Sequence, residues 1–181
     1  AARWFRKAAE QGHAEAQRNL AIMYRDGMGV SRDYAKSLAW YRKSASQNYA
    51  KAQFGLGRMH AMGLGTSKDP TKAEEWYRLA AEQGHLMAMN NLAFMWAAND
   101  KNLDEAEKFS RTTVEKEPEN AMWLDTLGWV LHKKGDHIAA AKMLERAVAI
   151  NSDNRETWSH LAIALLDAGD INKSTTAIEQ A

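Results

Sequence analysis

The sequence predicts an all-α fold, an α-solenoid of stacked helix-turn-helix repeats, on three observations. Trp4, Trp40 and Trp76 stand 36 residues apart, and each is followed directly by Phe or Tyr. A leucine recurs at intervals of 36, 36, 35 and 34 residues, at Leu20, Leu56, Leu92, Leu127 and Leu161. Residues that favour helices dominate the 181-residue chain, and only two prolines interrupt it. A period of this length is typical of small helical units that bury their apolar faces only by stacking on their neighbours.

The recurring leucines mark the first helix of each predicted pair. Each leucine is followed by a small residue, namely Ala21, Gly57, Ala93, Gly128 or Ala162. Four positions after each leucine stands a bulky residue: Tyr24, His60, Trp96, Leu131 or Leu165. Residues four apart share one helical face, and the small residue lets a neighbouring helix approach closely.

The second helices repeat an aromatic or aliphatic residue about one turn before a small one, as in Tyr41 and Ala45. Asp69 is expected to cap the helix that Pro70 begins, and Asp33 stands 36 residues earlier. The turns within the first two full pairs carry glycines 36 residues apart, Gly27 with Gly29 and Gly63 with Gly65. Because no strand precedes them, these glycines indicate turns with positive φ and not a phosphate-binding loop. The last two pairs are expected to turn at Gly135-Asp136 and Gly169-Asp170.

Residues 1 to 86 resemble Sel-one-like repeats. The resemblance rests on Ala16-Gln17, Gly27-x-Gly29, Trp40-Tyr41 and Ser44-Ala45, and on their counterparts 36 residues later. The units predicted from it are the second helix of a truncated repeat at 1–13 and two full repeats at 14–49 and 50–85.

From residue 86 onwards the pattern is similar to tetratricopeptide repeats. Residues 121–154 fit the 34-residue form through Leu124, Leu127-Gly128, Leu131, Ala140 and Leu144. The preceding repeat at 86–120 has one extra residue in its turn, and the repeat at 155–181 stops in its second helix. We expect all these units to form one continuous solenoid, a piece of a longer bacterial protein.

The two resemblances imply a right-handed α-solenoid whose concave surface binds other proteins or peptides, a scaffold without catalytic activity. A cell-envelope or secreted adaptor for polysaccharide export or peptidoglycan-associated machinery is the alternative. The compartment, cytoplasm or periplasm and cell envelope, stays open, as does the oligomeric state. Tetratricopeptide clamps for chaperone C-termini need an asparagine where this chain has Ile22, Arg58, Phe94, Trp129 and Ile163, so that partner is not expected.

The predicted partner-binding groove consists of inward-facing positions on the first helices. Its residues are Arg18, Ile22, Arg25, Phe54, Arg58, Met87, Asn90, Phe94, Met122, Asp125, Trp129 and His132. Aromatic, methionine and arginine side chains are enriched at protein interfaces. The three arginines predict that the bound segment has an acidic part, and Trp129 is the tryptophan expected to bind. The competing interpretation is that most of these residues pack against adjacent helices.

Charge and composition limit the other functional classes. Residues 1–86 carry 14 basic and 8 acidic side chains, a net charge of +6, whereas residues 87–181 carry 10 and 15, a net charge of −5. The acidic second half would repel phosphate, so an RNA-binding helical repeat is the lesser alternative and no nucleic acid partner is expected.

Catalytic chemistry, cofactors and metals are not expected from the sequence. The absence of cysteine excludes thiolate catalysis and cysteine-based zinc sites. His132 and His137 lie five residues apart across a turn with no third ligand at an obvious spacing. His13 and His85 belong to a repeated Gln-Gly-His ending and are expected to be structural. Pairings of Ser159 with His160, or of Asp125 with His132, lack an oxyanion hole. No stretch is long and apolar enough for a membrane span.

Overall fold

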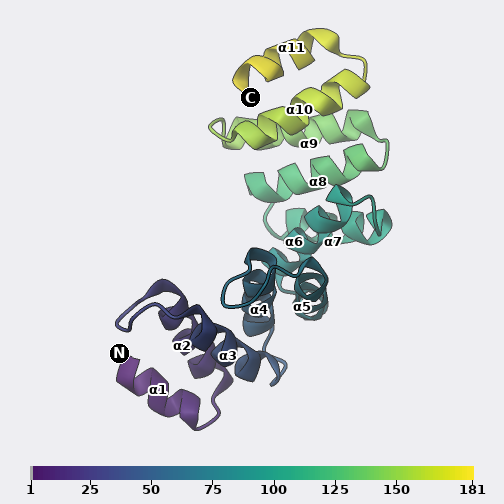
Figure 1. Cartoon of the computed structure of the whole chain (residues 1–181). Coiled ribbons are helices and arrows are strands. Elements are labelled where there is room, and N and C mark those ends of the chain that lie inside the picture. Colours follow the sequence, from purple (N-terminus) through teal and green to yellow (C-terminus); the bar gives the residue numbers. More distant parts are fainter. Residues whose placement is uncertain (1) are drawn as a thin grey trace. The chain divides into compact units, whose positions relative to one another are not determined.

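The computed structural model describes residues 2–181, with side chains described from residue 4 (Figure 1). This part of the chain is all-α: it contains eleven helices and no strand. The helices are α1 (Ala2–Glu10), α2 (Ala14–Asp26), α3 (Tyr34–Ala45), α4 (Ala50–Met62), α5 (Pro70–Glu82), α6 (Leu86–Ala98), α7 (Leu103–Lys116), α8 (Ala121–Lys133), α9 (His137–Ile150), α10 (Arg155–Asp167) and α11 (Ile171–Gln180). The chain divides into two compact units, residues 1–88 and 89–181, and the boundary falls within α6. One continuous stack of all the repeats stays a prediction.

The turns and helix starts of unit 1 follow the predicted chemistry. Gly27 and Gly63 adopt φ values of 73° and 70° at the ends of α2 and α4. The Asp33 carboxylate accepts a hydrogen bond from the Lys36 backbone N–H at 2.9 Å, and Asp69 accepts one from Lys72 at 3.0 Å. These contacts satisfy backbone donors that have no partner within the helix. The predicted caps of α3 and α5 are therefore confirmed.

Unit 1 packs aromatic rings against glycines of α4. A Cβ atom added to Gly55 would lie 2.2 Å from the Tyr41 ring, and one added to Gly57 would lie 2.7 Å from the Tyr77 ring. Both tyrosines are almost fully buried. The small residues thus allow α3 and α5 to approach α4 from either side, as predicted for Gly57.

Glutamine side chains join the two halves of each full repeat in unit 1. Gln47 donates a hydrogen bond to Gln17 at 2.8 Å, and Gln83 donates one to Gln53 at 2.6 Å. Both acceptors are at most 5% exposed, and the two pairs are related by 36 residues. In each pair, a side chain from the turn after the second helix of the repeat satisfies a buried carbonyl oxygen of the first helix.

The three tryptophans of the repeating series differ in burial. Trp40 and Trp76 are partly buried and pack against the apolar cluster around Leu56 and Tyr41. Trp4 is 77% exposed, because no helix precedes α1 in the described residues and none covers this face. Two of the three tryptophans therefore contribute to the packing of unit 1.

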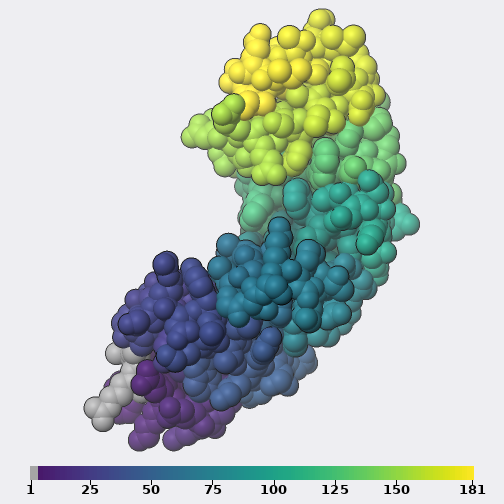
Figure 2. Space-filling model, viewed as in Figure 1, coloured from purple at the N-terminus to yellow at the C-terminus, as the bar shows by residue number. Residues whose placement is uncertain are grey.

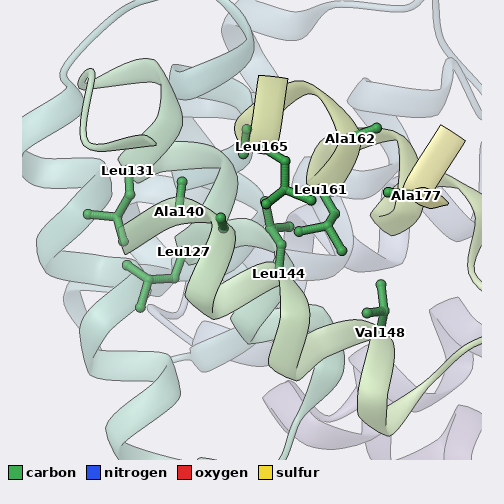
Figure 3. Close-up of a cluster of buried hydrophobic side chains, with 11 residues drawn as sticks. Leu127, Leu131, Ala140, Leu144, Val148, Leu161, Ala162, Leu165 and Ala177 are labelled. Atoms are coloured by element: carbon green, nitrogen blue, oxygen red, sulfur yellow. The ribbon is translucent and has the colours of Figure 1, made fainter. Parts of the chain in front are cut away.

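Unit 2 has an aliphatic core between α8, α9, α10 and α11 (Figure 3). Leu127 and Leu131 of α8 face Leu144 of α9, which in turn contacts Leu161 of α10. Gly128 lets α9 approach, since an added Cβ would lie 2.6 Å from Leu144. In the space-filling view, the atoms of α8 to α11, in green to yellow, form one closely packed surface (Figure 2).

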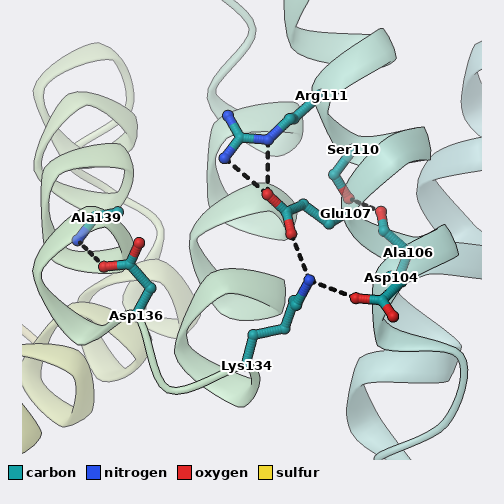
Figure 4. Close-up of polar contacts among 8 residues, drawn as sticks. All are labelled: Asp104, Ala106, Glu107, Ser110, Arg111, Lys134, Asp136 and Ala139. Atoms are coloured by element: carbon teal, nitrogen blue, oxygen red, sulfur yellow. Dashed lines mark hydrogen bonds and ion pairs between the residues drawn. The ribbon is translucent and has the colours of Figure 1, made fainter.

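Ion pairs connect the outer surfaces of the helix pairs in unit 2. The Lys134 ammonium lies 2.6 Å from an Asp104 carboxylate oxygen and 2.7 Å from one of Glu107, and Glu107 also binds Arg111 (Figure 4). The Asp136 carboxylate accepts a hydrogen bond from the Ala139 backbone N–H and so caps α9 (Figure 4). Lys134 thus links the start of α7 to the turn between α8 and α9.

None of the described helices combines the length and the apolar character that crossing a bilayer requires.

Candidate functional site

In unit 1 the predicted groove residues Arg18, Arg25 and Arg58 gather around the hydroxyl group of Tyr41. Arg25 donates a hydrogen bond to that hydroxyl at 3.4 Å. Burial raises the pKa of the Tyr41 phenol, and the positive charges of Arg25, Arg18 and Arg58 oppose this increase. Because Gly55 has no side chain, the Tyr41 ring passes against α4 and its hydroxyl reaches the arginines of α2 and α4.

A pocket of about 410 Å³ opens beside this cluster, and we call it the arginine pocket. Its lining residues are Arg25, Asp26, Arg32, Tyr34, Gly55, Arg58, Met59, Met62 and Leu64. Three guanidinium groups and one carboxylate give it a net positive charge. The methionines and Leu64 supply an apolar wall, so the pocket offers charge and apolar surface together.

The arginines of the arginine pocket are unequally neutralised. Arg25 holds Asp26 through two contacts of 2.7 Å. This hydrogen bond lowers the pKa of Asp26 and raises that of Arg25. Arg58 is exposed and has no hydrogen bond or ion pair within the described part of the chain. Arg18 gives one hydrogen bond to Asn19, while its buried Nε has no partner there.

Sequence reasoning missed Arg32, which lies in the turn between α2 and α3. It also lines the arginine pocket, and its guanidinium carbon lies 5.6 Å from the centre of the Tyr34 ring. The signal that could have found it is the basic residue Lys68, which stands at the equivalent position 36 residues later.

The remaining predicted residues of unit 1 are engaged in packing to different degrees. Ile22 is half-buried against the core of α3 and α4. Phe54 stacks on His85 at a ring distance of 4.6 Å and lies 5.7 Å from Tyr77. Met87 is half-buried. The His85 ring also accepts a hydrogen bond from the Ala88 backbone N–H at the start of α6, which supports the structural role predicted for it.

In unit 2 the predicted binding residue Trp129 lies between two imidazole rings, and we call this group the Trp129 stack. Its ring centre lies 4.4 Å from that of His160 and 5.0 Å from that of His132, at interplanar angles of 21° and 20°. Trp129 remains partly exposed. Since both faces of the indole are covered by imidazoles, a partner would contact its exposed edge.

Asp125 pairs with His160 and not with His132, the pairing considered from the sequence. The two side chains approach to 2.9 Å, and both are largely buried. They stand 35 residues apart, so the contact joins α8 to α10. Sequence spacing could not reveal it, because it depends on how the two helices pack. The hydroxyl of Ser159, the nucleophile considered from the sequence, donates a hydrogen bond to the Arg155 carbonyl oxygen at 3.0 Å.

The other predicted residues of unit 2 lie around the Trp129 stack or beneath the surface. Phe94 lies 6.4 Å from the His160 ring and is partly exposed. Met122 is exposed. Asn90 is buried, so its side chain is not part of the exposed surface, although its Oδ1 has no hydrogen-bond partner in the described part of the chain. Burial lowers the pKa of His132, and the neighbouring His137 lowers it further.

Comparison with protein families identifies both kinds of repeat. Residues 1–13, 14–49 and 50–85 match the Sel1 repeat. Residues 131–181 match a tetratricopeptide repeat. The chain therefore carries Sel1 repeats at residues 1–85, followed by a tetratricopeptide repeat at residues 131–181. Repeats of these two kinds typically mediate protein–protein interactions and are generally non-catalytic.

Solved structures extend the similarity over nearly the whole chain. The protein is similar to c5321, a protective antigen of uropathogenic Escherichia coli strains with a Sel1-like repeat fold, at 29% identity and a TM-score of 0.77. That match covers 99% of this chain but 40% of the other. A Sel1 repeat protein from Oxalobacter formigenes matches at 26% identity and a TM-score of 0.69, covering 94% of this chain and 73% of the other.

The tetratricopeptide protein YrrB, described as having an unusual peptide-binding site, shares the fold at 16% identity and a TM-score of 0.78. This match covers 99% of this chain and 91% of YrrB. A search of curated proteins finds no match. The comparisons agree with an all-α repeat fold of bacterial type.

Proposed function

We propose that the protein is a non-catalytic scaffold that binds an acidic segment of a partner protein in the arginine pocket. The observation that carries the proposal is the unequal neutralisation of the guanidinium groups there. Arg25 has a carboxylate partner, whereas the exposed Arg58 has none in the described part of the chain. A carboxylate of a bound peptide could accept two parallel hydrogen bonds from such a guanidinium.

The Trp129 stack is proposed as a second contact surface, within unit 2. The exposed edge of Trp129 and the exposed Met122 offer apolar contacts. Aromatic and methionine side chains dominate the energetics of many interfaces, and methionine adapts to different partners. This surface therefore suits an apolar residue of a partner, whereas the arginine pocket suits an acidic one.

The test is a quantitative affinity capture by the full-length protein from a lysate of its own bacterium. Each recovered partner is then measured directly as a purified protein against Arg58→Ala, Trp129→Ala and the control Arg42→Ala. Arg42 is exposed on α3 outside the arginine pocket, so both arginine variants lose the same charge. We expect Arg58→Ala to weaken binding at least about tenfold, since hydrogen bonds to a charged group are worth about 1.5–3 kcal/mol.

The salt dependence of binding tests whether the partner binds through an acidic segment. Binding by the wild type is expected to weaken as NaCl increases, and this dependence is expected to be shallower in Arg58→Ala than in Arg42→Ala. If Arg58→Ala and Trp129→Ala both bind every partner as the wild type does, the proposal is wrong. Competition by an RNA oligonucleotide for the same surface would instead support an RNA-binding repeat.

The alternative of a cell-envelope or secreted adaptor is favoured by one comparison. The similar Escherichia coli protein is described as a protective antigen, a description that suits a protein exposed to antibodies. Fractionation of cells that express the full-length protein tests this alternative. Recovery with the envelope or the medium supports it, and recovery with the cytosol contradicts it.

A further inference from the structure

Two histidines and an aspartate from three helices of unit 2 come together at one end of the α8–α9 turn. His132 belongs to the last turn of α8, His137 begins α9 and Asp167 ends α10. One candidate ligand atom from each residue lies within 4.8 Å of the others. The sequence suggested no third ligand for the two histidines, because Asp167 is 35 residues from His132 and reaches it only when α10 packs against α8.

The imidazole nitrogens already have the spacing of two ligands on one metal ion. The Nδ1 atoms of His132 and His137 are 3.2 Å apart. With zinc–nitrogen bonds of about 2.0–2.1 Å and tetrahedral angles, two ligand nitrogens would lie roughly 3.3 Å apart. Both Nδ1 atoms could therefore coordinate one ion after only a small adjustment of the rings.

Asp167 faces the other nitrogen of His132. One of its carboxylate oxygens lies 3.8 Å from His132 Nε2. This distance is too long for a hydrogen bond, so the carboxylate acts through its charge. Its negative charge favours a proton on Nε2, which leaves the lone pair of Nδ1 for a metal ion. Loss of a carboxylate beside a metal-binding histidine typically weakens metal affinity by about 10–100-fold.

The local backbone fixes the two rings. Gly135 adopts φ = 88° in the turn, and the Asp136 carboxylate caps α9, which places His137 beside the end of α8. Trp129 stacks on the His132 ring at 5.0 Å and limits its rotation. The site is thus built from a turn and a packed aromatic ring, and it needs no mobile segment.

The surrounding charges also suit a cation. The two lysines that follow His132 both have carboxylate partners, Lys133 with Asp100 at 2.9 Å and Lys134 with Asp104 and Glu107, although the charge of Lys133 still lowers the pKa of His132. His132 and Asp167 stand at the C-terminal ends of α8 and α10, where the helix dipoles are negative. The opposing positive end of α9 is capped by the Asp136 carboxylate.

We propose that His132 and His137 bind a first-row divalent metal ion such as Zn²⁺ through their Nδ1 atoms, with Asp167 orienting His132 and water completing the coordination. Imidazole ligands select zinc, copper, nickel and cobalt over magnesium and calcium. The bound ion would link the α8–α9 turn to the imidazole that covers one face of Trp129. It would stabilise unit 2 by its binding to the folded state.

The test is calorimetric titration of the tag-free full-length protein with ZnCl₂, with MgCl₂ as the negative probe. The wild type is expected to bind one Zn²⁺ and to melt at a higher temperature in its presence, an effect that EDTA reverses. His137→Ala should lose this binding, and Asp167→Asn should weaken it about 10–100-fold. His13→Ala, which removes an exposed histidine of unit 1, should bind Zn²⁺ like the wild type.

Two further measurements distinguish a loss of zinc binding from a loss of folding and identify the metal ligands. Circular dichroism confirms that each variant is folded, and nitrogen NMR of the histidine rings identifies the coordinating atoms. Zinc is expected to shift the Nδ1 resonances of His132 and His137 and to leave the Nδ1 of His13 unchanged. Failure of the wild type to bind Zn²⁺, or equal binding by folded His137→Ala, would overturn the proposal. In that case the two rings share an N–H···N hydrogen bond instead.

Discussion

The two units build similar helix pairs with different interior chemistry. Unit 1 places the rings of Tyr41 and Tyr77 against glycines and joins the two halves of each full repeat by glutamine pairs. Unit 2 packs leucines around Leu144 and joins its repeats by ion pairs on the surface. The shared feature is a small residue where the helices approach most closely, Gly57 in unit 1 and Gly128 in unit 2.

This difference shows which parts of a helical repeat are interchangeable. The close approach needs a small residue at a fixed position, since side-chain atoms of the neighbouring helix already occupy the place of a Cβ. The filling side chain can be a tyrosine or a leucine. The polar connection between helices can be an amide pair or an ion pair. The units should therefore respond differently to mutation, pH and salt.

The largest effect is expected from emptying the aliphatic core of unit 2. Leu144→Ala removes a fully buried side chain that contacts α8, α9 and α10 residues, and we expect a loss of about 2–5 kcal/mol of unfolding free energy. Urea denaturation measures the loss, and hydrogen exchange locates it. The control Ile138→Ala changes an exposed residue of the same helix and should stay within about 0.5 kcal/mol. An equal loss of hydrogen-exchange protection in both units would contradict the division of the chain into two units.

The next largest effect is expected from filling the glycine contacts. Gly55→Ala places a methyl group against the rigid Tyr41 ring, and we expect a loss of about 1–3 kcal/mol. Gly128→Ala meets the branched end of Leu144, which can change rotamer, so its cost should be smaller. Parallel urea denaturation of the two variants measures the difference. An equal or larger loss in Gly128→Ala would show that ring rigidity does not set the cost.

The sequence predicted the repeat register because packing imposes it at every turn of the array. Leu20, Leu56 and Leu92 are fully buried, and the predicted caps Asp33 and Asp69 accept the expected backbone hydrogen bonds. These features depend on neighbours within about one repeat, where spacing determines which residues share a face.

The candidate sites were only partly predictable, because they depend on contacts between repeats. Arg25 and Arg58 were expected near each other and both line the arginine pocket. The partner of Asp125 proved to be His160, and Asp167 joins the histidines only through the packing of α10. Such contacts follow from helix orientations and rotamers, which the spacing of residue types does not specify.

A change of pH should reveal how the buried His60 of unit 1 contributes to the stability of the protein. His60 is buried, its Nδ1 has no hydrogen-bond partner in the described part of the chain, and burial lowers its pKa below the ordinary value of 6.5. The nearby positive charges of Arg42 and Lys72 lower the pKa further. The folded state therefore favours the neutral ring, and this contribution is complete above pH 6.5 and is lost as pH falls through the folded pKa.

The measurement is urea denaturation at pH 7 and pH 5 of the wild type and of His60→Leu. We expect the wild type to lose more stability than the variant, because only the wild type must protonate the buried ring. The carboxylates with lowered pKa, such as Asp69, titrate below this range and do not contribute. An equal loss in the two proteins would show that His60 does not control the acid response.

The smallest effects are expected from the polar connections between helices, and salt should separate them. Gln83→Ala leaves the buried Gln53 carbonyl oxygen without its 2.6 Å donor and should cost about 1 kcal/mol at any NaCl concentration. Lys134→Met removes the surface ion pairs with Asp104 and Glu107, and its smaller destabilisation should disappear between 0.05 and roughly 1 M NaCl, where the screening length falls to about 3 Å. Urea denaturation at both salt concentrations tests the contrast. If Gln83→Ala also depended on salt, the connection in unit 1 would be electrostatic as well, and the distinction between glutamine pairs and surface charges would fail.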